Sequence, residues 1–202
     1  MKKFIRDNPT IAFGLGLPLL LVAIFLAISG IPTLLVAPAQ YEVLYATHYS
    51  VYNNAQNAIQ IAVVGDRVQV SYVGNTQPYQ TPRLWRFNPK TGSAKEIALQ
   101  LPPGLAPNSG RPVEAEKTPI VTPIDVPDLA GLKVDSSSLA PDGYTFSSGA
   151  DYYGGHVFDG MFFSSRHRMQ AELIKDGRSI RLPNTEGAHY GNTVRFVGWV
   201  LP

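Results

Sequence analysis

The longest apolar stretch of the chain lies near its N-terminus. No charged side chain occurs from Asn8 to Tyr41, and residues 11–37 are apolar apart from a few glycine, proline, serine and threonine residues. About twenty apolar residues in a helix cross a hydrocarbon core of roughly 30 Å, whereas a secretory leader has an apolar core of about 7 to 15 residues. The pattern predicts a transmembrane signal anchor over residues 11–37. The alternatives are a leader cleaved after Ala39, because Ala37-Pro38-Ala39 has the small-x-small pattern of a cleavage site, and a buried core helix.

The charges on either side of this stretch predict its orientation. Lys2, Lys3 and Arg6 precede it, and the first charge after it is Glu42. By the positive-inside rule, residues 1–10 form a cytoplasmic flank. We therefore expect a single-pass protein of the inner (cytoplasmic) membrane, with a cytoplasmic N-terminus and a periplasmic C-terminal domain.

The apolar stretch and the segment after it contain candidate contact residues. Small residues and prolines inside a span are tolerated where neighbouring helices pack closely, so the lipid bilayer and other integral membrane subunits are expected partners. In the juxtamembrane segment 38–57, four tyrosines are spaced by four, four and three residues, which fits one face of a helix at a membrane surface or a strand with buried rings. The candidate interface residues are Gly14, Gly16, Pro18, Gly30, Pro32, Tyr41, Tyr45, Tyr49 and Tyr52.

Alternating apolar and polar positions predict a first β-sheet over residues 58–101. With Gly65-Asp66 as a two-residue hairpin turn, apolar side chains of residues 59–63 face those of residues 68–72 in the order Val63 with Val68, Ile61 with Val70 and Ile59 with Tyr72. Strands near residues 83–87 and 95–101 complete a four-stranded meander. Seven prolines between residues 102 and 131 predict a linker without regular structure.

The segment 132–202 is predicted to form a second β-sheet of the same kind. The pairs Asp142-Gly143, Asp159-Gly160 and Asp176-Gly177 recur at intervals of 17 residues and mark strand reversals, and a last strand is expected at residues 194–201. The predicted fold class is mainly β: one transmembrane helix, then an antiparallel ectodomain of two related four-stranded sheets, arranged like propeller blades or as a sandwich.

Two short segments resemble blades of β-propellers. Leu139-Ala-Pro-Asp-Gly-Tyr-Thr-Phe146 resembles the Ser-Pro-Asp-Gly turn of TolB-type and WD40-like blades, and Leu84-Trp-Arg-Phe-Asn-Pro-Lys-Thr-Gly92 is similar to another blade's hairpin. The resemblance implies a binding or scaffolding surface and supplies no catalytic residues. A closed propeller needs about four or more blades, and this ectodomain has room for two or three sheets.

Composition and motifs argue against catalysis. The net charge of +2 comes from the N-terminal flank, since the rest of the chain carries as many acidic as basic side chains, and this balance argues against a nucleic-acid partner. There is no cysteine, and the histidines at positions 48, 156, 167 and 189 lack metal-binding spacings. No nucleophile elbow or phosphate loop occurs either. We expect no catalytic residue, no metal and no cofactor.

Aromatic and glycine residues gather between positions 144 and 163, where they form either the core of a small sheet or an exposed platform. The candidate ligand face comprises Tyr144, Tyr152, Tyr153, His156 and Phe158. The leading functional hypothesis is a membrane-anchored, non-catalytic accessory, assembly or scaffolding subunit of a membrane protein complex. The alternatives are a cell-envelope module that binds glycan or peptide through the aromatic face and, third, a hydrolase.

Overall fold

The computed structural model describes residues 9–49, 58–73, 81–100, 121–148, 170–185 and 194–202. The chain divides into two compact units, one of Met1–Ala37 with Asp176–Arg178 and one of Pro38–Lys175 with Ser179–Pro202. The first contains the helix and the second almost all of the β structure. The predicted class, a mainly β chain with one helix, is confirmed in this coarse form.

Helix α2 spans Pro9–Leu35. Proline is well tolerated in the first turn because its missing N–H has no partner inside a helix there. The structure contradicts the prediction of a single-pass inner-membrane protein with a cytoplasmic N-terminus. Within the described residues, no helix is both long and apolar enough to cross a membrane.

The largest sheet has five antiparallel strands in the order β5-β4-β1-β11-β7. Its strands are β1 (Glu42–Thr47), β4 (Arg83–Asn88), β5 (Ser93–Ile97), β7 (Lys133–Asp135) and β11 (Val194–Leu201). The central strand β1 is buried on both faces, which explains its nearly continuous apolar sequence. The strand expected at residues 194–201 is confirmed as β11 with the same bounds.

Two three-stranded sheets accompany it. One has the order β2-β3-β6, with β2 at Ile59–Val64, β3 at Arg67–Val73 and β6 at Val121–Ile124. The other has the order β10-β9-β8, with β8 at Thr145–Ser147, β9 at Glu172–Lys175 and β10 at Arg178–Arg181. A short 3-10 helix, η2, lies at Pro127–Leu129.

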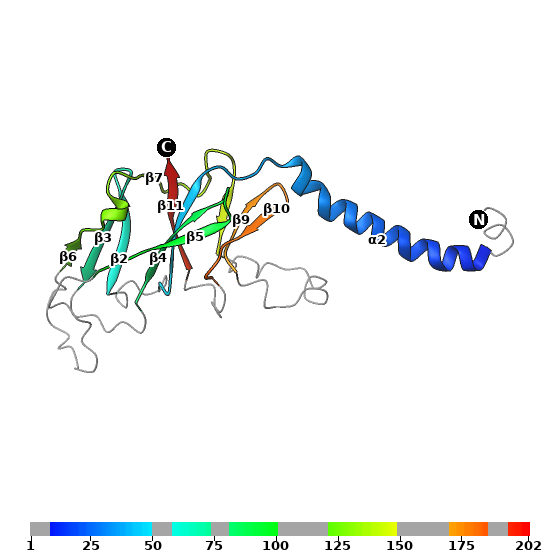
Figure 1. Ribbon diagram of the computed structural model, residues 1–202, viewed down its shortest axis with the longest axis horizontal. Helices are drawn as coiled ribbons and strands as arrows, with labels where there is room; N and C mark the ends of the chain where they lie inside the picture. Colours follow the sequence, from blue (N-terminus) through cyan, green and yellow to red (C-terminus); the bar gives the residue numbers. More distant parts are fainter. Residues whose placement is uncertain (1–8, 50–57, 74–80, 101–120, 149–169, 186–193) are drawn as a thin grey trace, which may run out of the picture. The chain divides into compact units, whose positions relative to one another are not determined.

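The five-stranded sheet is covered on both faces. One core joins it to the β2-β3-β6 sheet, through side chains such as Leu44 and Leu84 on one side and Ile61 and Tyr72 on the other. A second core joins its opposite face to the β8-β9-β10 sheet, where Trp199 packs among Tyr144 and Leu173. Figure 1 shows β2, β3 and β6 on one side of β1 and β11, and β9 and β10 on the other. The β structure is thus a sandwich of three layers.

The β2–β3 hairpin has the predicted register. Ile59 pairs with Tyr72, Ile61 with Val70 and Val63 with Val68. Gly65 and Asp66 adopt φ values of 53° and 63°, the left-handed conformation that a two-residue hairpin turn requires. Local turn chemistry was therefore sufficient to predict this element.

Two further expectations are corrected. The described strands form one sheet of five strands and two of three instead of two related sheets of four, because β4 pairs with β1 and β5 pairs with β4, and neither pairs with β3. The proline-rich segment was predicted to lack regular elements, yet β6 and η2 lie within it. Pro123 is tolerated because β6 is an edge strand among the described strands, where a missing N–H breaks no ladder on the outer side.

Candidate binding surfaces

The span residues singled out from the sequence lie in α2. Gly14, Gly16, Pro18, Gly30 and Pro32 all fall within its helical backbone. A Cβ atom placed on Gly14 or Gly16 would meet no atom within 4 Å. These two glycines therefore leave room along the helix for a close neighbour, although no described element occupies it.

The tyrosine series is resolved in favour of a strand. Tyr45 lies within β1 and Tyr49 just beyond it, and both rings are buried, whereas Tyr41 is half-buried against the second core. The Tyr45 hydroxyl donates a hydrogen bond to the carbonyl oxygen of Pro183 at 2.6 Å, and burial raises the pKa of this phenol far above its usual value. Tyr52 lies outside the described residues.

The candidate ligand face is described at one residue only. Tyr144 is 1% exposed and belongs to the second core, as expected if the aromatic cluster is structural. The Lys175 ammonium lies 5.7 Å from the centre of its ring and donates a hydrogen bond to the carbonyl oxygen of Asp142. Tyr152, Tyr153, His156 and Phe158 lie outside the described residues.

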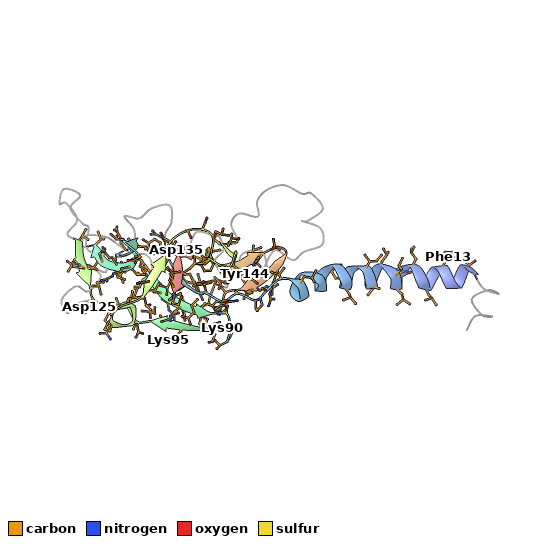
Figure 2. The ribbon with its side chains drawn as sticks, turned by 90° about the horizontal axis from the view of Figure 1, so that it is seen from above. Phe13, Lys90, Lys95, Asp125, Asp135 and Tyr144 are labelled. Atoms are coloured by element: carbon orange, nitrogen blue, oxygen red, sulfur yellow. The ribbon has the colours of Figure 1, made fainter. Side chains whose placement is uncertain are left out.

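The most extensive exposed apolar surface of the described chain is on α2. The large hydrophobic side chains of this helix that the structure describes project from several of its sides, as Figure 2 shows around Phe13, and are between 45% and 80% exposed. They are Phe13, Leu15, Leu17, Leu19, Leu20, Leu21, Val22, Ile24, Phe25, Leu26 and Leu35. An apolar surface of this extent marks a site of interaction.

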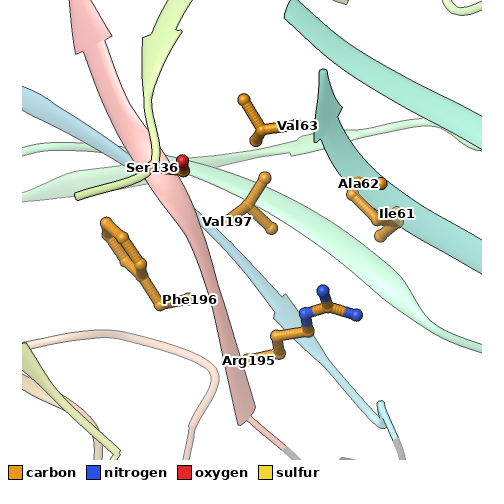
Figure 3. Close-up of a pocket in the computed structure, with 7 residues that line it drawn as sticks. All are labelled: Ile61, Ala62, Val63, Ser136, Arg195, Phe196 and Val197. Atoms are coloured by element: carbon orange, nitrogen blue, oxygen red, sulfur yellow. The ribbon is translucent and has the colours of Figure 1, made fainter. Parts of the chain in front are cut away.

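A second surface feature is an open groove of about 330 Å³ between β2 and β11. Figure 3 shows Val197 on its floor, β2 along one wall, and the Arg195 side chain reaching from β11 toward β2. The Phe196 ring points away, where it lies 5.2 Å from the rings of Phe146 and Trp199. The lining residues are Ile61, Ala62, Val63, Ser136, Arg195, Phe196 and Val197.

Arg195 gives the groove its chemical character. Its guanidinium group donates a hydrogen bond to the Tyr49 hydroxyl at 2.6 Å and lies 4.8 Å from the centre of the Tyr49 ring. The described ion pairs join Arg83 to Glu96, Arg86 to Glu42 and Lys95 to Asp128, and none of them involves Arg195. The groove therefore presents a positioned cation beside apolar walls.

The strand β11 is irregular beside the groove. Leu44 pairs with Gly198 and Tyr45 with Phe196, so the register between β1 and β11 shifts past Val197. A bulge of this kind changes which face a side chain occupies. Here Val197 belongs to the first core and Trp199 to the second, although residues two apart share a face in a regular strand.

The polar groups in the described cores have structural partners. The Trp85 indole N–H donates to the Thr47 hydroxyl at 3.0 Å, and the Trp199 indole N–H donates to the carbonyl oxygen of Ser137 at 3.0 Å. Hydrogen bonds from the Ser137 amide and hydroxyl lower the pKa of Asp135. No group of three metal-ligating side chains occurs in the described ranges. That the protein lacks a metal, a cofactor and catalysis stays a prediction.

Sequence reasoning missed Arg195 and the outer edge of β2. The available signal was a single basic residue within the otherwise apolar last strand. Its significance depends on Tyr49 and β2, which lie far away in the sequence. In comparisons with known proteins, no family model, no curated protein and no solved structure matches the chain.

Proposed function

We propose that this chain is a non-catalytic accessory protein that takes part in the assembly of a membrane protein complex, with α2 as its main attachment surface. The observation that carries this proposal is the set of eleven exposed large hydrophobic side chains among those of α2 that the structure describes. The expected neighbours of α2 are apolar helices of a partner protein. The β sandwich serves as the rigid part that this attachment positions.

The energetics of hydration support a covered α2. The free energy of a large aliphatic or aromatic side chain falls by about 1.5–3 kcal/mol when the side chain moves from water to an apolar environment. For eleven such side chains, partial coverage alone is worth on the order of 10 kcal/mol, which exceeds the cost of association in many complexes. The helix has no acidic residue in its first turn and no basic residue in its last, so charge does not oppose an apolar neighbour.

Small residues supply a geometric argument for a helical neighbour. Helices associate closely where small residues allow their backbones to approach, and Gly14 and Gly16 have open space beside them. The side chains around them, such as Phe13 and Leu17, project well beyond the backbone. A partner helix can thus settle against the glycines and contact the larger side chains on either side.

The test compares two equally exposed apolar residues changed to glutamate in the full chain. Leu20 on α2 is 56% exposed and Val121 on β6 is 58% exposed. Each tagged variant is cross-linked in cells and purified in mild detergent, and its stoichiometric partners are identified by mass spectrometry. We expect Leu20→Glu to lose the partner of the wild-type chain and Val121→Glu to keep it, because only the former places a charge within the attachment surface.

Direct contact is read from a photo-reactive amino acid placed at position 20. Cross-linking to a defined integral membrane protein supports the proposal. A detergent monomer with no protein adduct at this position, or equal loss of the partner in both glutamate variants, contradicts it. Adducts to lipid alone would assign α2 to lipid attachment without a protein partner.

A second function is favoured by the groove beside Arg195. A cell-envelope module that binds glycan or peptide was the alternative hypothesis from the sequence, based on the aromatic face around residues 144–158. The described structure instead favours the groove, because it combines a strand edge, apolar walls and a cation. Its ligand is the subject of the following inference.

A further inference from the structure

We infer that the groove between β2 and β11 binds an extended peptide segment that carries a carboxylate, with the peptide added as a strand to the outer edge of β2 and its carboxylate held by Arg195. This site is separate from the attachment surface on α2. It specifies a second kind of partner contact, made by backbone hydrogen bonds and one charge.

The outer edge of β2 has the geometry for strand addition. In a hairpin closed by a two-residue turn, the residues that flank the turn form a hydrogen-bonded pair, and such pairs alternate along the ladder. Val64 and Arg67 flank the turn, so Ala62 and Gln60 also direct their backbone groups toward β3. The N–H and C=O groups of Ile61 and Val63 consequently point away from β3.

No described strand pairs with this outer edge, because β2 is terminal in the order β2-β3-β6. The described backbone hydrogen bonds outside regular ladders also include none from Ile61 or Val63. Unpaired strand edges are templates for an added strand, and several peptide-binding domains use this mode. Alternate side chains of the added strand would face Val197 and the apolar walls.

Arg195 supplies recognition of charge. Guanidinium groups present five donors in a planar fork, and one of them is used by the Tyr49 hydroxyl. The Tyr49 ring beneath the guanidinium fixes its position, so less conformational entropy is lost when an anion binds. Figure 3 shows the guanidinium group extending toward Ile61, so a peptide along β2 would have its carboxylate toward the Ile61 end.

Charge complementarity favours this occupant over a second copy of the chain. If two copies paired edge to edge through β2, the added strand would be Ile-Gln-Ile-Ala-Val-Val, which contains no acidic residue. Arg195 of each copy would then gain no anion from that strand. A carboxylate-bearing segment satisfies both the strand edge and the cation.

The direct test uses fluorescent probes on the full chain in mild detergent. The first probe is the peptide Val-Thr-Val-Thr-Val with a free C-terminal carboxylate, and the second is its C-terminal amide. A third is the amide form with a glutamate in place of the central valine, which distinguishes a terminal from a side-chain carboxylate. We expect at least one carboxylate probe to bind at least tenfold more tightly than the neutral amide, since charge-assisted hydrogen bonds exceed neutral ones in strength.

Protein variants locate the binding site. Arg195→Gln removes the charge in the groove, and Arg67→Gln removes the same charge at the exposed hairpin end outside the groove lining. We expect about a tenfold loss of affinity for Arg195→Gln, a smaller loss for Arg195→Lys and no loss for Arg67→Gln. Circular dichroism spectra confirm that all three variants keep the β structure.

Backbone-methylated probes test strand addition without altering the protein. Methyl groups on alternate peptide nitrogens block one edge of an extended peptide, and methyl groups on the intervening nitrogens block the other. Strand addition predicts that only one of the two methylation patterns abolishes binding. Any one of four results would overturn the inference. These are equal effects of the two methylation patterns, equal affinity of the carboxylate and amide probes, equal losses of affinity in the two glutamine variants, and no saturable binding. A concentration-dependent dimer that excludes the probes would also overturn it and assign β2 to self-association.

Discussion

At the scale of single residues, three buried tyrosines show how burial decides the role of a side chain. Tyr45 donates its hydroxyl proton to a backbone carbonyl, Tyr49 accepts a hydrogen bond from Arg195, and Tyr144 lies beneath the ammonium of Lys175. The three tyrosine residues are buried, and the hydrogen bonds of Tyr45 and Tyr49 are partly buried, which limits competition from water. Tyr49 thus supports a candidate binding residue, whereas Tyr45 and Tyr144 support the core.

Because its pKa is raised, Tyr45 should make the folded protein less stable at alkaline pH. Burial raises its pKa in the folded protein, so between the unfolded pKa of about 10 and the folded pKa the folded state holds more protons than the unfolded state. The free energy of unfolding must therefore fall as the pH rises above about 10, by at most about 1.4 kcal/mol per pH unit from this group. Urea unfolding at about pH 8 and about pH 11 should show a smaller decrease for Tyr45→Phe than for the wild type.

At pH 8, Tyr45→Phe should itself lower the stability of the protein. Tyr45→Phe leaves the Pro183 carbonyl oxygen without this donor and should reduce the free energy of unfolding by about 1 kcal/mol at pH 8. Tyr41→Phe, at a half-buried ring, controls for the loss of a tyrosine. If Tyr45→Phe and the wild type lost the same stability between the two pH values, a raised Tyr45 pKa would be ruled out as the cause.

At the scale of elements, β11 and β7 approach each other closely at Gly198. Gly198 pairs with Leu44 at the register shift, and a Cβ atom on Gly198 would lie 2.3 Å from Cγ1 of Val134 and 2.7 Å from the carbonyl oxygen of Asp135. Such distances are too short for nonbonded atoms, and one of the two belongs to the backbone. The glycine therefore lets β7 pack against β11 where the strand is bulged.

Gly198→Ala should destabilise the protein by about 2–3 kcal/mol, because β7 must move to accept the methyl group. Gly65→Ala is the control, since Gly65 has a φ of 53° but open space at its Cβ position, and it should cost about 1 kcal/mol. Urea unfolding measures both. Equal costs for the two variants would mean that backbone conformation and not the contact with β7 sets the effect at Gly198.

The elements that the sequence predicted well are those with local causes. The Gly65-Asp66 turn and the alternation on either side of it determine the β2–β3 register without help from the rest of the chain. The position of β1 has no such cause: it pairs with β4 on one side and with β11, about 150 residues away, on the other. The four-stranded meander was wrong for this reason, and the groove beside Arg195, which β2 and β11 build together, was equally inaccessible.

At the scale of the β sandwich, the five-stranded sheet is shared by two hydrophobic cores. Leu44 and Tyr45 are adjacent in β1, yet Leu44 lies in the first core and Tyr45 in the second. Neither outer sheet can lose its packing without exposing one face of this central sheet to water. We therefore expect the three layers to unfold as one cooperative unit.

Both tryptophans of the chain, Trp85 and Trp199, lie in the second core and report on it by fluorescence. Val70→Ala changes only the first core, where Val70 is 3% exposed, and should reduce stability by about 2 kcal/mol. If the layers unfold together, this substitution must lower the urea midpoint of tryptophan fluorescence as much as that of far-ultraviolet circular dichroism. Gln69→Ala, at the exposed neighbouring position of β3, should move neither midpoint. A fluorescence midpoint unchanged by Val70→Ala would mean that the sheets on the two faces of the central sheet unfold independently, and that the groove can open while the tryptophan core remains folded.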